Sequence, residues 1–231
     1  MNEKWKFYHG SKDIIAQPVY GQGNPHNDYG LGFYCTESSD LAKEWACSSE
    51  NDGFANCYFF DPKDLAVLEL NNGEHHILNW LAILLENRTF RITSPAAEQA
   101  RNYLLDVFKP DYKAFDIIKG YRADDSYFSF ATAFLNNGIS LTQLERAMTL
   151  GKLGEQIVIC SRKAFDRLEF ASAQIASREE FYPKKMERDR AARGAFRMEK
   201  NSPPAESDVY MLDILRERWD NNDTRLQRIV Y

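Results

Sequence analysis

Two glycines and two aromatic residues occupy a short stretch in which their spacing could create a binding site for a flat ring. Gly30 and Gly32 precede the apolar run Phe33–Cys35, for which the sequence predicts a buried strand. Glycines at these positions let the backbone turn tightly and approach a neighbouring group closely. Tyr34 lies on the predicted strand, and Trp45 lies on the helix predicted to follow it. A corner with one aromatic on each arm can hold a planar group between two ring faces.

The helix that carries Trp45 has a clear start in the sequence. Ser38 or Ser39 can cap its N-terminus, and Asp40 suits its first turn. The same two aromatics, Tyr34 and Trp45, could instead be ordinary core residues, because aromatics at strand and helix positions usually are.

Composition limits the classes of protein that this chain can represent. It has 231 residues, a net charge of −5, 44% hydrophobic and 27% charged residues, and a high aromatic share of 13%. These values predict a globular protein and argue against a general nucleic-acid binder. The N-terminus is unlike a signal peptide, and no run is long and apolar enough for a membrane span, so a cytoplasmic protein without a membrane partner is expected. Four scattered cysteines predict reduced thiols with neither a disulfide framework nor a metal site: Cys35, Cys47, Cys57 and Cys160.

Strands and helices alternate unevenly along the chain, which predicts an α+β fold. Strands are expected near 5–8, 33–35, 55–60, 65–70, 114–118, 155–160 and 168–175, with a polar, glycine-rich surface segment at 12–30. We predict one domain over 1–200, followed at 201–231 by a linker and a C-terminal amphipathic helix. That helix is predicted over 208–219, with Leu212, Leu215 and Trp219 on one face.

Three separated motifs resemble, in the same order, those of the ADP-ribosyltransferase superfamily, in the diphtheria-toxin and poly(ADP-ribose)-polymerase branch that uses a His-Tyr-Glu triad. The first is Tyr8-His9-Gly10-Ser11, the second is Gly30-Leu31-Gly32-Phe33-Tyr34 with Trp45, and the third is Gly154-Glu155-Gln156-Ile157-Val158. The chain is also similar to a bacterial family that is often encoded beside small antitoxin-like proteins, through its YHGS opening and its Gly120–Phe130 run GYRADDSYFSF.

The resemblance implies a split β-sheet core with surrounding helices and an NAD-binding cleft between the halves of the sheet. It places His9 on the ribose next to nicotinamide and the Gly10 backbone on the carboxamide. Tyr34 and Trp45 would cover the two faces of the nicotinamide ring. Glu155 would contact the 2′-hydroxyl of the nicotinamide ribose and stabilise the positive charge that develops as the glycosidic bond breaks.

Ser11 and Gly32 belong to the same motifs and complete the NAD-binding set that the resemblance implies. Arg122 could meet the NAD pyrophosphate through a charge-assisted contact. Asp124 and Asp125 could shape the acceptor side, or could only cap a helix.

Each of these residues also has an ordinary structural interpretation. Glu155 could be a solvated charge at the end of a strand, and His9 could be a satisfied structural histidine. His75 and His76 lack partners at metal-ligand spacing and are interpreted as structural. The basic segment 184–200 could be a solvated helix face, or a patch for RNA or a phosphorylated acceptor, and the last helix could pack on the domain or dock a partner.

The motifs depart from the family pattern at three positions. Ala42 replaces a serine that binds the carboxamide in the polymerases, and Trp45 replaces a tyrosine. Leu153, two residues before Glu155, is neither Glu nor Gln, so the pattern of arginine- and asparagine-modifying relatives is absent.

The sequence therefore predicts a mono-ADP-ribosyltransferase that uses NAD as a substrate to modify an intracellular protein or nucleic acid. The resemblance further suggests the toxin of a toxin–antitoxin pair, with an antitoxin protein as a possible partner. Two alternatives stay open: an NAD glycohydrolase of the same fold, and an inactive module that binds NAD or ADP-ribose. A catalytic Glu155 would separate the enzymes from the binding module.

Overall fold

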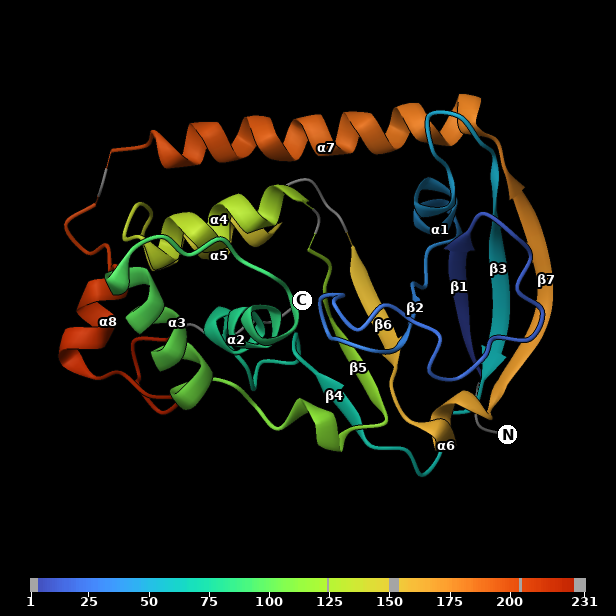
Figure 1. Ribbon diagram of the computed structural model, residues 1–231, viewed down its shortest axis with the longest axis horizontal. Coiled ribbons are helices and arrows are strands. Elements are labelled where there is room, and N and C mark those ends of the chain that lie inside the picture. The colour runs from blue at the N-terminus through green and yellow to red at the C-terminus, as the bar shows by residue number, and fades with distance from the viewer. Residues whose placement is uncertain (1–3, 124, 150–153, 204, 227–231) are drawn as a thin grey trace.

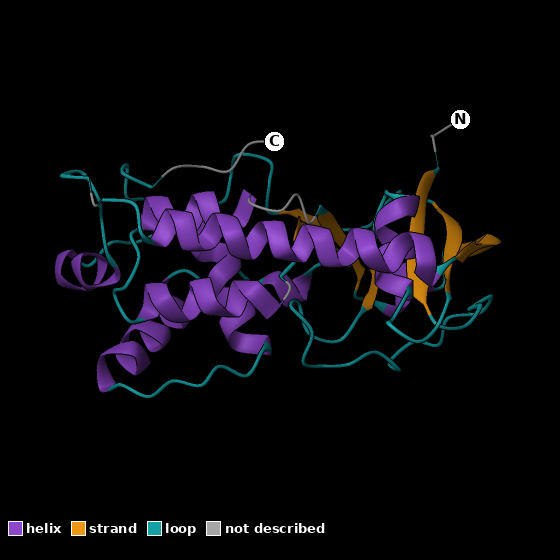
Figure 2. Ribbon diagram, turned by 90° about the horizontal axis from the view of Figure 1, so that it is seen from above, coloured by secondary structure: helices purple, strands orange, loops and turns teal. Residues whose placement is uncertain are grey.

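Most of the helices lie at one end of the molecule and the strands lie toward the other, and one long helix spans both ends (Figures 1 and 2). The computed structural model describes residues 4–123, 125–149, 154–203 and 205–226. The mixture of helices and open sheets confirms the predicted α+β class. The predictions for Asp124 and Leu153 fall outside the described residues.

The strands form two sheets. One has three antiparallel strands in the order β1-β3-β7, and the other has four in the order β2-β6-β5-β4, with only the β4–β5 pair parallel. The strands are β1 (Trp5–Ser11), β2 (Phe33–Cys35), β3 (Gly53–Phe60), β4 (Val67–Glu69), β5 (Ile117–Tyr121), β6 (Glu155–Ile159) and β7 (Leu168–Ala176).

The two sheets meet where β1 and the end of β2 run side by side. Tyr8 and Thr36 form an isolated antiparallel bridge, with reciprocal backbone hydrogen bonds of 2.8 and 2.9 Å. Beside this bridge, Phe7 and Phe60 of the three-stranded sheet share a buried cluster with Phe33 and other residues of the four-stranded sheet. The aromatic-rich cluster thus fixes the sheets relative to each other.

The helical end is built around a helix that is buried on all sides. Every residue of α2 from Ile77 to Leu85 is buried, and these side chains share the largest core with α3, α4 and α5. Among the described residues, no helix combines the length and the apolar composition that a membrane crossing requires. The helices are α1 (Ser39–Ala46), α2 (Ile77–Asn87), α3 (Pro95–Val107), α4 (Asp125–Leu135), α5 (Leu141–Thr149), α6 (Arg162–Phe165), α7 (Arg178–Lys200) and α8 (Met211–Glu217), with a 3-10 turn at Tyr112–Ala114.

Several element ends differ from the sequence prediction, and two of these differences have a clear structural cause. The strand expected at 114–118 is β5, Ile117–Tyr121, because the 3-10 turn takes up the residues before it. The last helix is shorter than 208–219, because Arg218 adopts a left-handed conformation that ends it. Its buried face is formed by Met211 and Ile214, while Leu212 is 43% exposed, so the predicted face was wrong at that position.

The C-terminal segment packs back on the helical end of the domain. Trp219, just beyond α8, is 2% exposed, and its carbonyl accepts a hydrogen bond of 2.8 Å from the Tyr103 hydroxyl of α3. The Asn221 amide donates a hydrogen bond of 2.8 Å to the Val107 carbonyl at the end of the same helix.

Candidate functional site

His9 lies at the junction of the two sheets. Its Nδ1 is 2.7 Å from the Tyr34 carbonyl oxygen, and its ring stacks on Phe33 with the ring centroids 4.3 Å apart. A carbonyl oxygen can only accept, so Nδ1 carries the proton and Nε2 is the acceptor nitrogen. Burial lowers the pKa of His9, although this hydrogen bond opposes the effect, and the neutral ring is therefore favoured.

Tyr34 is held at both ends by the stretch that precedes it. Its hydroxyl donates to the Gly30 carbonyl at 2.7 Å and accepts from the Tyr29 N–H at 3.1 Å. Gly30 has a φ of +79°, which favours glycine, and a Cβ atom on Gly32 would lie only 2.4 Å from the Val158 side chain. Gly30 thus permits the tight turn and Gly32 the close approach that the sequence predicts, and the two hydrogen bonds fix the Tyr34 ring in place.

Trp45 lies near the end of α1, where a cation covers its ring. Ser38 caps this helix by accepting from the Leu41 N–H at 3.2 Å. The Arg122 guanidinium carbon lies 4.7 Å from the centroid of the Trp45 ring. The buried Trp45 Nε1 finds no hydrogen-bond acceptor within the described residues.

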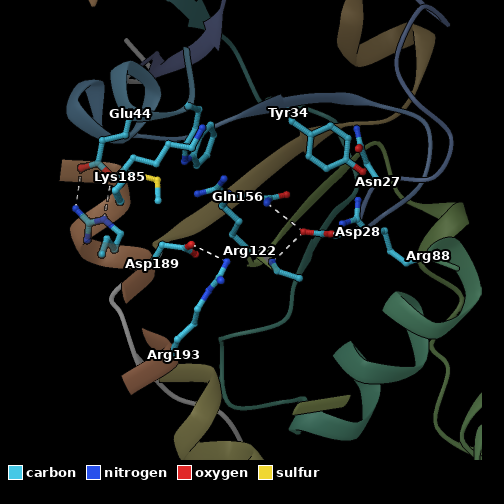
Figure 3. Close-up of a pocket in the computed structure, with 14 residues that line it drawn as sticks. Asn27, Asp28, Tyr34, Glu44, Arg88, Arg122, Gln156, Lys185, Asp189 and Arg193 are labelled. Carbon is cyan, nitrogen blue, oxygen red and sulfur yellow. Dashed lines mark hydrogen bonds and ion pairs between the residues drawn. The ribbon is translucent and has the colours of Figure 1, made fainter. Parts of the chain in front are cut away.

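Tyr34, Trp45 and Arg122 line one pocket with a volume of about 430 Å³ (Figure 3). Side chains of α7 approach it from one side, and Asp28 and Arg88 lie on the other, with Gln156 between them. Its charged lining comprises five cationic and three acidic side chains: Arg88, Arg122, Lys185, Arg188 and Arg193, with Asp28, Glu44 and Asp189.

Asp28 is a buried carboxylate in the wall of this pocket. Its Oδ2 accepts from the Ala123 N–H at 2.9 Å and from Gln156 Nε2 at 3.2 Å, while its Oδ1 lies 3.6 Å from Arg88 Nε. Burial raises the pKa of Asp28 to about 6, although these contacts and the Arg122 charge favour the ionised form. The other amide atom of the same glutamine, Gln156 Oε1, is buried and has no donor among the described residues.

Helix α7 supplies the cationic wall of the pocket. Arg188 forms a two-pronged ion pair with the buried Glu44 of α1, with distances of 2.9 and 3.0 Å. Arg193 donates to Asp189 at 2.8 Å one turn away. Burial, together with the nearby Arg122 charge, lowers the pKa of Lys185. These contacts hold α7 against α1 and direct several positive charges into the pocket.

A second pocket of about 420 Å³ lies beneath the surface segment that joins β1 to β2. It shares Asn27 and Tyr34 with the first pocket, and His9 and Gly32 also line it. Residues of the surface segment 12–30 line this pocket, so the segment forms one of its walls.

The remaining predicted site residues line neither of these two pockets. A Cβ atom on Gly10 would lie 2.0 Å from the Ala42 carbonyl oxygen, so Gly10 serves the close packing of β1 on α1. Ser11 donates to the Asp13 carbonyl at 2.7 Å and accepts from the Asn56 amide at 2.8 Å. Glu155 begins β6 and accepts a hydrogen bond from the Asn71 amide.

Five of the pocket residues that sequence reasoning did not select come from the basic helix. Within α7, Lys185, Arg188 and Asp189 recur at helical spacing, and the buried Ala192 continues the same face. This helical periodicity was the sequence signal that could have predicted a row of charged side chains facing the domain. Asp28 lies in the Asn27–Thr36 stretch, but a lone aspartate before a turn gives no indication of its burial.

Comparisons with curated proteins and with solved structures find no match. A family model does match residues 5–170, from the start of β1 into β7, which is more than half of the chain. The chain belongs to this family, which is described as "Protein of unknown function (DUF3990)".

Proposed function

We propose that this protein is an NAD-dependent mono-ADP-ribosyltransferase that modifies an intracellular macromolecule, as the toxin of a toxin–antitoxin pair would. The observation that carries the proposal is the placement of Tyr34, Trp45 and five cationic side chains around one pocket. Nicotinamide in NAD⁺ is a flat, positively charged ring, which suits aromatic faces, and the pyrophosphate is a dianion, which suits a cationic wall.

The polar atoms in the pocket wall also suit this substrate. Trp45 Nε1 is a donor and Gln156 Oε1 is an acceptor, and both are buried without a partner among the described residues. A carboxamide offers one acceptor and one amino group, which is the complementary set.

The proposed reaction separates nicotinamide from the rest of NAD⁺. The bond between the ribose C1′ and the ring nitrogen breaks, and its electron pair leaves with nicotinamide. An oxocarbenium-like ribose then accepts a lone pair from the acceptor nucleophile, whose proton passes to solvent water. In this scheme Glu155 stabilises the positive charge at the ribose, a role that requires a carboxylate but no proton transfer.

A second candidate function is a module that binds NAD or ADP-ribose without catalysis. The observation that favours it is the position of Glu155, which accepts a hydrogen bond from Asn71 and does not line the aromatic pocket. A binding module needs the aromatic and cationic walls but has no use for a carboxylate at the ribose.

Incubation of the protein with tagged NAD⁺ and cell lysate tests the proposal directly. We expect labelled macromolecules, which protease and nuclease treatment would sort into protein and nucleic acid. Nicotinamide release without any labelled product would indicate a glycohydrolase instead.

Glu155→Gln separates the enzyme from the binding module. We expect turnover to fall roughly 10²–10³-fold with NAD affinity nearly unchanged, because one electrostatic stabiliser is lost. Glu169→Gln, on the exposed face of β7, is the matched control and should retain full turnover. Wild-type turnover in Glu155→Gln, or no turnover in the wild type together with NAD binding, would reject the catalytic role.

A further inference from the structure

A groove beside the aromatic pocket has a lining that suits a single strand of nucleic acid. It has a volume of about 620 Å³ and lies between the segment after α2, one face of α4 and the last residue of α7. We propose that this groove binds single-stranded nucleic acid and presents it to the pocket as the acceptor, an assignment that rests on the proposed function.

Two aromatic rings form one side of the groove. Phe90 and Phe128 are both partly exposed, and their ring centroids lie 5.1 Å apart with the planes tilted by 46°. Unpaired bases stack on such side chains with little preference for sequence, because every base has a π face. A pair of accessible rings therefore offers a stacking platform.

Positive charge surrounds this platform. Arg91 and Lys200 are exposed and line the groove, and the Arg88 guanidinium carbon lies 4.5 Å from the centroid of the Phe128 ring. No Asp or Glu occurs among the described residues that line the groove. In a chain with a net charge of −5, this local excess of cations favours a polyanion at this place.

Arg88 connects the groove with the wall of the aromatic pocket. Arg88 contacts both, because its Nε lies 3.6 Å from Asp28 Oδ1 in the pocket wall while its guanidinium covers Phe128. The chain itself also connects them, since Arg122 and Ala123 line the pocket and Phe128 and Ser129 line the groove. A strand seated in the groove would thus lie next to the side of the pocket that Arg88 and Asp28 form.

The chemistry of the lining favours nucleic acid over an acidic peptide. Carboxylate side chains would use the cations but would leave the Phe90–Phe128 pair without a partner. Ser129, Thr132 and Asn136 add hydroxyl and amide groups, which can bond to base edges or phosphate oxygens. Stacking also requires unpaired bases, so a duplex should bind more weakly than a single strand.

Fluorescence anisotropy with a short labelled oligonucleotide, as single-stranded RNA and as DNA, tests this inference on the full chain. We expect Arg91→Gln/Lys200→Gln to weaken binding of the better strand about tenfold and to reduce the slope of log K against log salt by about 1.4. Phe90→Leu/Phe128→Leu keeps the apolar volume but removes the rings, and it should cost roughly tenfold or more without changing that slope.

The matched control is Lys12→Gln/Lys63→Gln, which removes two exposed positive charges from positions outside the groove. It should bind the oligonucleotide like the wild type. Wild-type affinity in Arg91→Gln/Lys200→Gln, or tighter binding of a glutamate-rich peptide than of the oligonucleotide, would overturn the inference.

Calorimetry with NAD⁺ on the same preparations separates this inference from the proposed function. The groove variants should bind NAD⁺ like the wild type. Normal NAD⁺ binding with no oligonucleotide binding would overturn the groove assignment and leave the proposed function standing. Oligonucleotide binding without NAD⁺ binding would reject the proposed function. The acceptor role of the groove would then fail with it, because that role requires NAD⁺ as the donor.

Discussion

The two walls of the aromatic pocket differ in where they come from in the chain. Tyr34 and Trp45 lie close together in sequence, on β2 and α1, and both fall within the family-matched residues 5–170. Lys185, Arg188 and Arg193 lie on α7, beyond those residues. The aromatic wall is thus a local strand–helix corner, whereas the cationic wall exists only because a distant helix crosses it (Figure 1).

This difference assigns separate tasks to the two walls. The corner is fixed by local turns and a cap, and its strand β2 also pairs with β6. The cationic wall depends on long-range contacts of α7, among them the ion pair between Glu44 and Arg188, whose residues are 144 apart, and the hydrogen bond of 3.3 Å from Lys185 Nζ to the Cys47 carbonyl. We therefore expect the walls to be separable by substitution, in stability and in the part of the ligand that each one binds.

The largest expected effect comes from breaking a contact that holds the cationic wall. Arg188→Ala leaves the nearly buried Glu44 carboxylate without its ion pair, which typically costs about 3–5 kcal/mol. Chemical denaturation should show this loss, whereas Arg190→Ala, at an exposed site on the same helix, should stay within about 0.5 kcal/mol of the wild type.

A second substitution checks that explanation. Adding Glu44→Gln to Arg188→Ala removes the uncompensated charge and should recover part of the lost stability. If Arg188→Ala unfolds like the wild type, α7 does not depend on this pair.

The next effect concerns Asp28, on the side of the pocket opposite α7. Its pKa is raised from 3.8 to about 6, so the folded protein keeps a proton that the unfolded chain releases. This stabilising contribution is complete below about pH 4 and is lost as the pH rises through about 6. Relative to Asp28→Asn, the wild type should lose on the order of 2–3 kcal/mol of unfolding free energy across that window.

Denaturation curves for both proteins from pH 3 to 8 measure this difference. It should level off above about pH 7, where Asp28 is ionised in both states. A difference that stays constant between pH 4 and 6 would show that Asp28 is not the titrating group.

A smaller effect should separate the parts of NAD⁺ that the pocket binds. Arg122→Gln removes a cation from the pyrophosphate side and should weaken NAD⁺ and ADP-ribose about tenfold or somewhat more. Nicotinamide alone should bind as it does to the wild type. Isothermal calorimetry with the three ligands tests this pattern, and an equal loss for nicotinamide would place Arg122 at the ring instead.

The sequence predicted most of the elements because their signals are local. Ser38, Ser94 and Ser161 cap α1, α3 and α6 through their side-chain oxygens, and glycine placement explains the turn before β2. The errors occur where a non-local contact or an unusual backbone conformation determines where an element begins or ends. The 3-10 turn places the start of β5 later than predicted. The left-handed conformation of Arg218 ends α8 before Trp219, so Trp219 does not belong to the helix.

The residues of the candidate site likewise fall into those that local sequence signals indicated and those that they did not. Tyr34, Trp45 and Arg122 were selected from the sequence, and the structure places them around one pocket. The α7 side chains and Asp28 were not selected, because their importance comes from tertiary packing. A basic helix is usually a solvated face, and only the position of α7 over α1 turns part of it inward.

The most direct test of the account is a calorimetric titration of NAD⁺ into wild-type protein, Trp45→Phe and Trp45→Ala, with thermal melting of the same preparations. The account predicts NAD⁺ binding by the wild type, a small loss for Trp45→Phe, and a loss of about tenfold or somewhat more for Trp45→Ala, with little change in melting temperature. Early melting of Trp45→Ala combined with wild-type NAD⁺ affinity would assign Trp45 to the core, and the absence of NAD⁺ binding by the wild type would contradict the central claim.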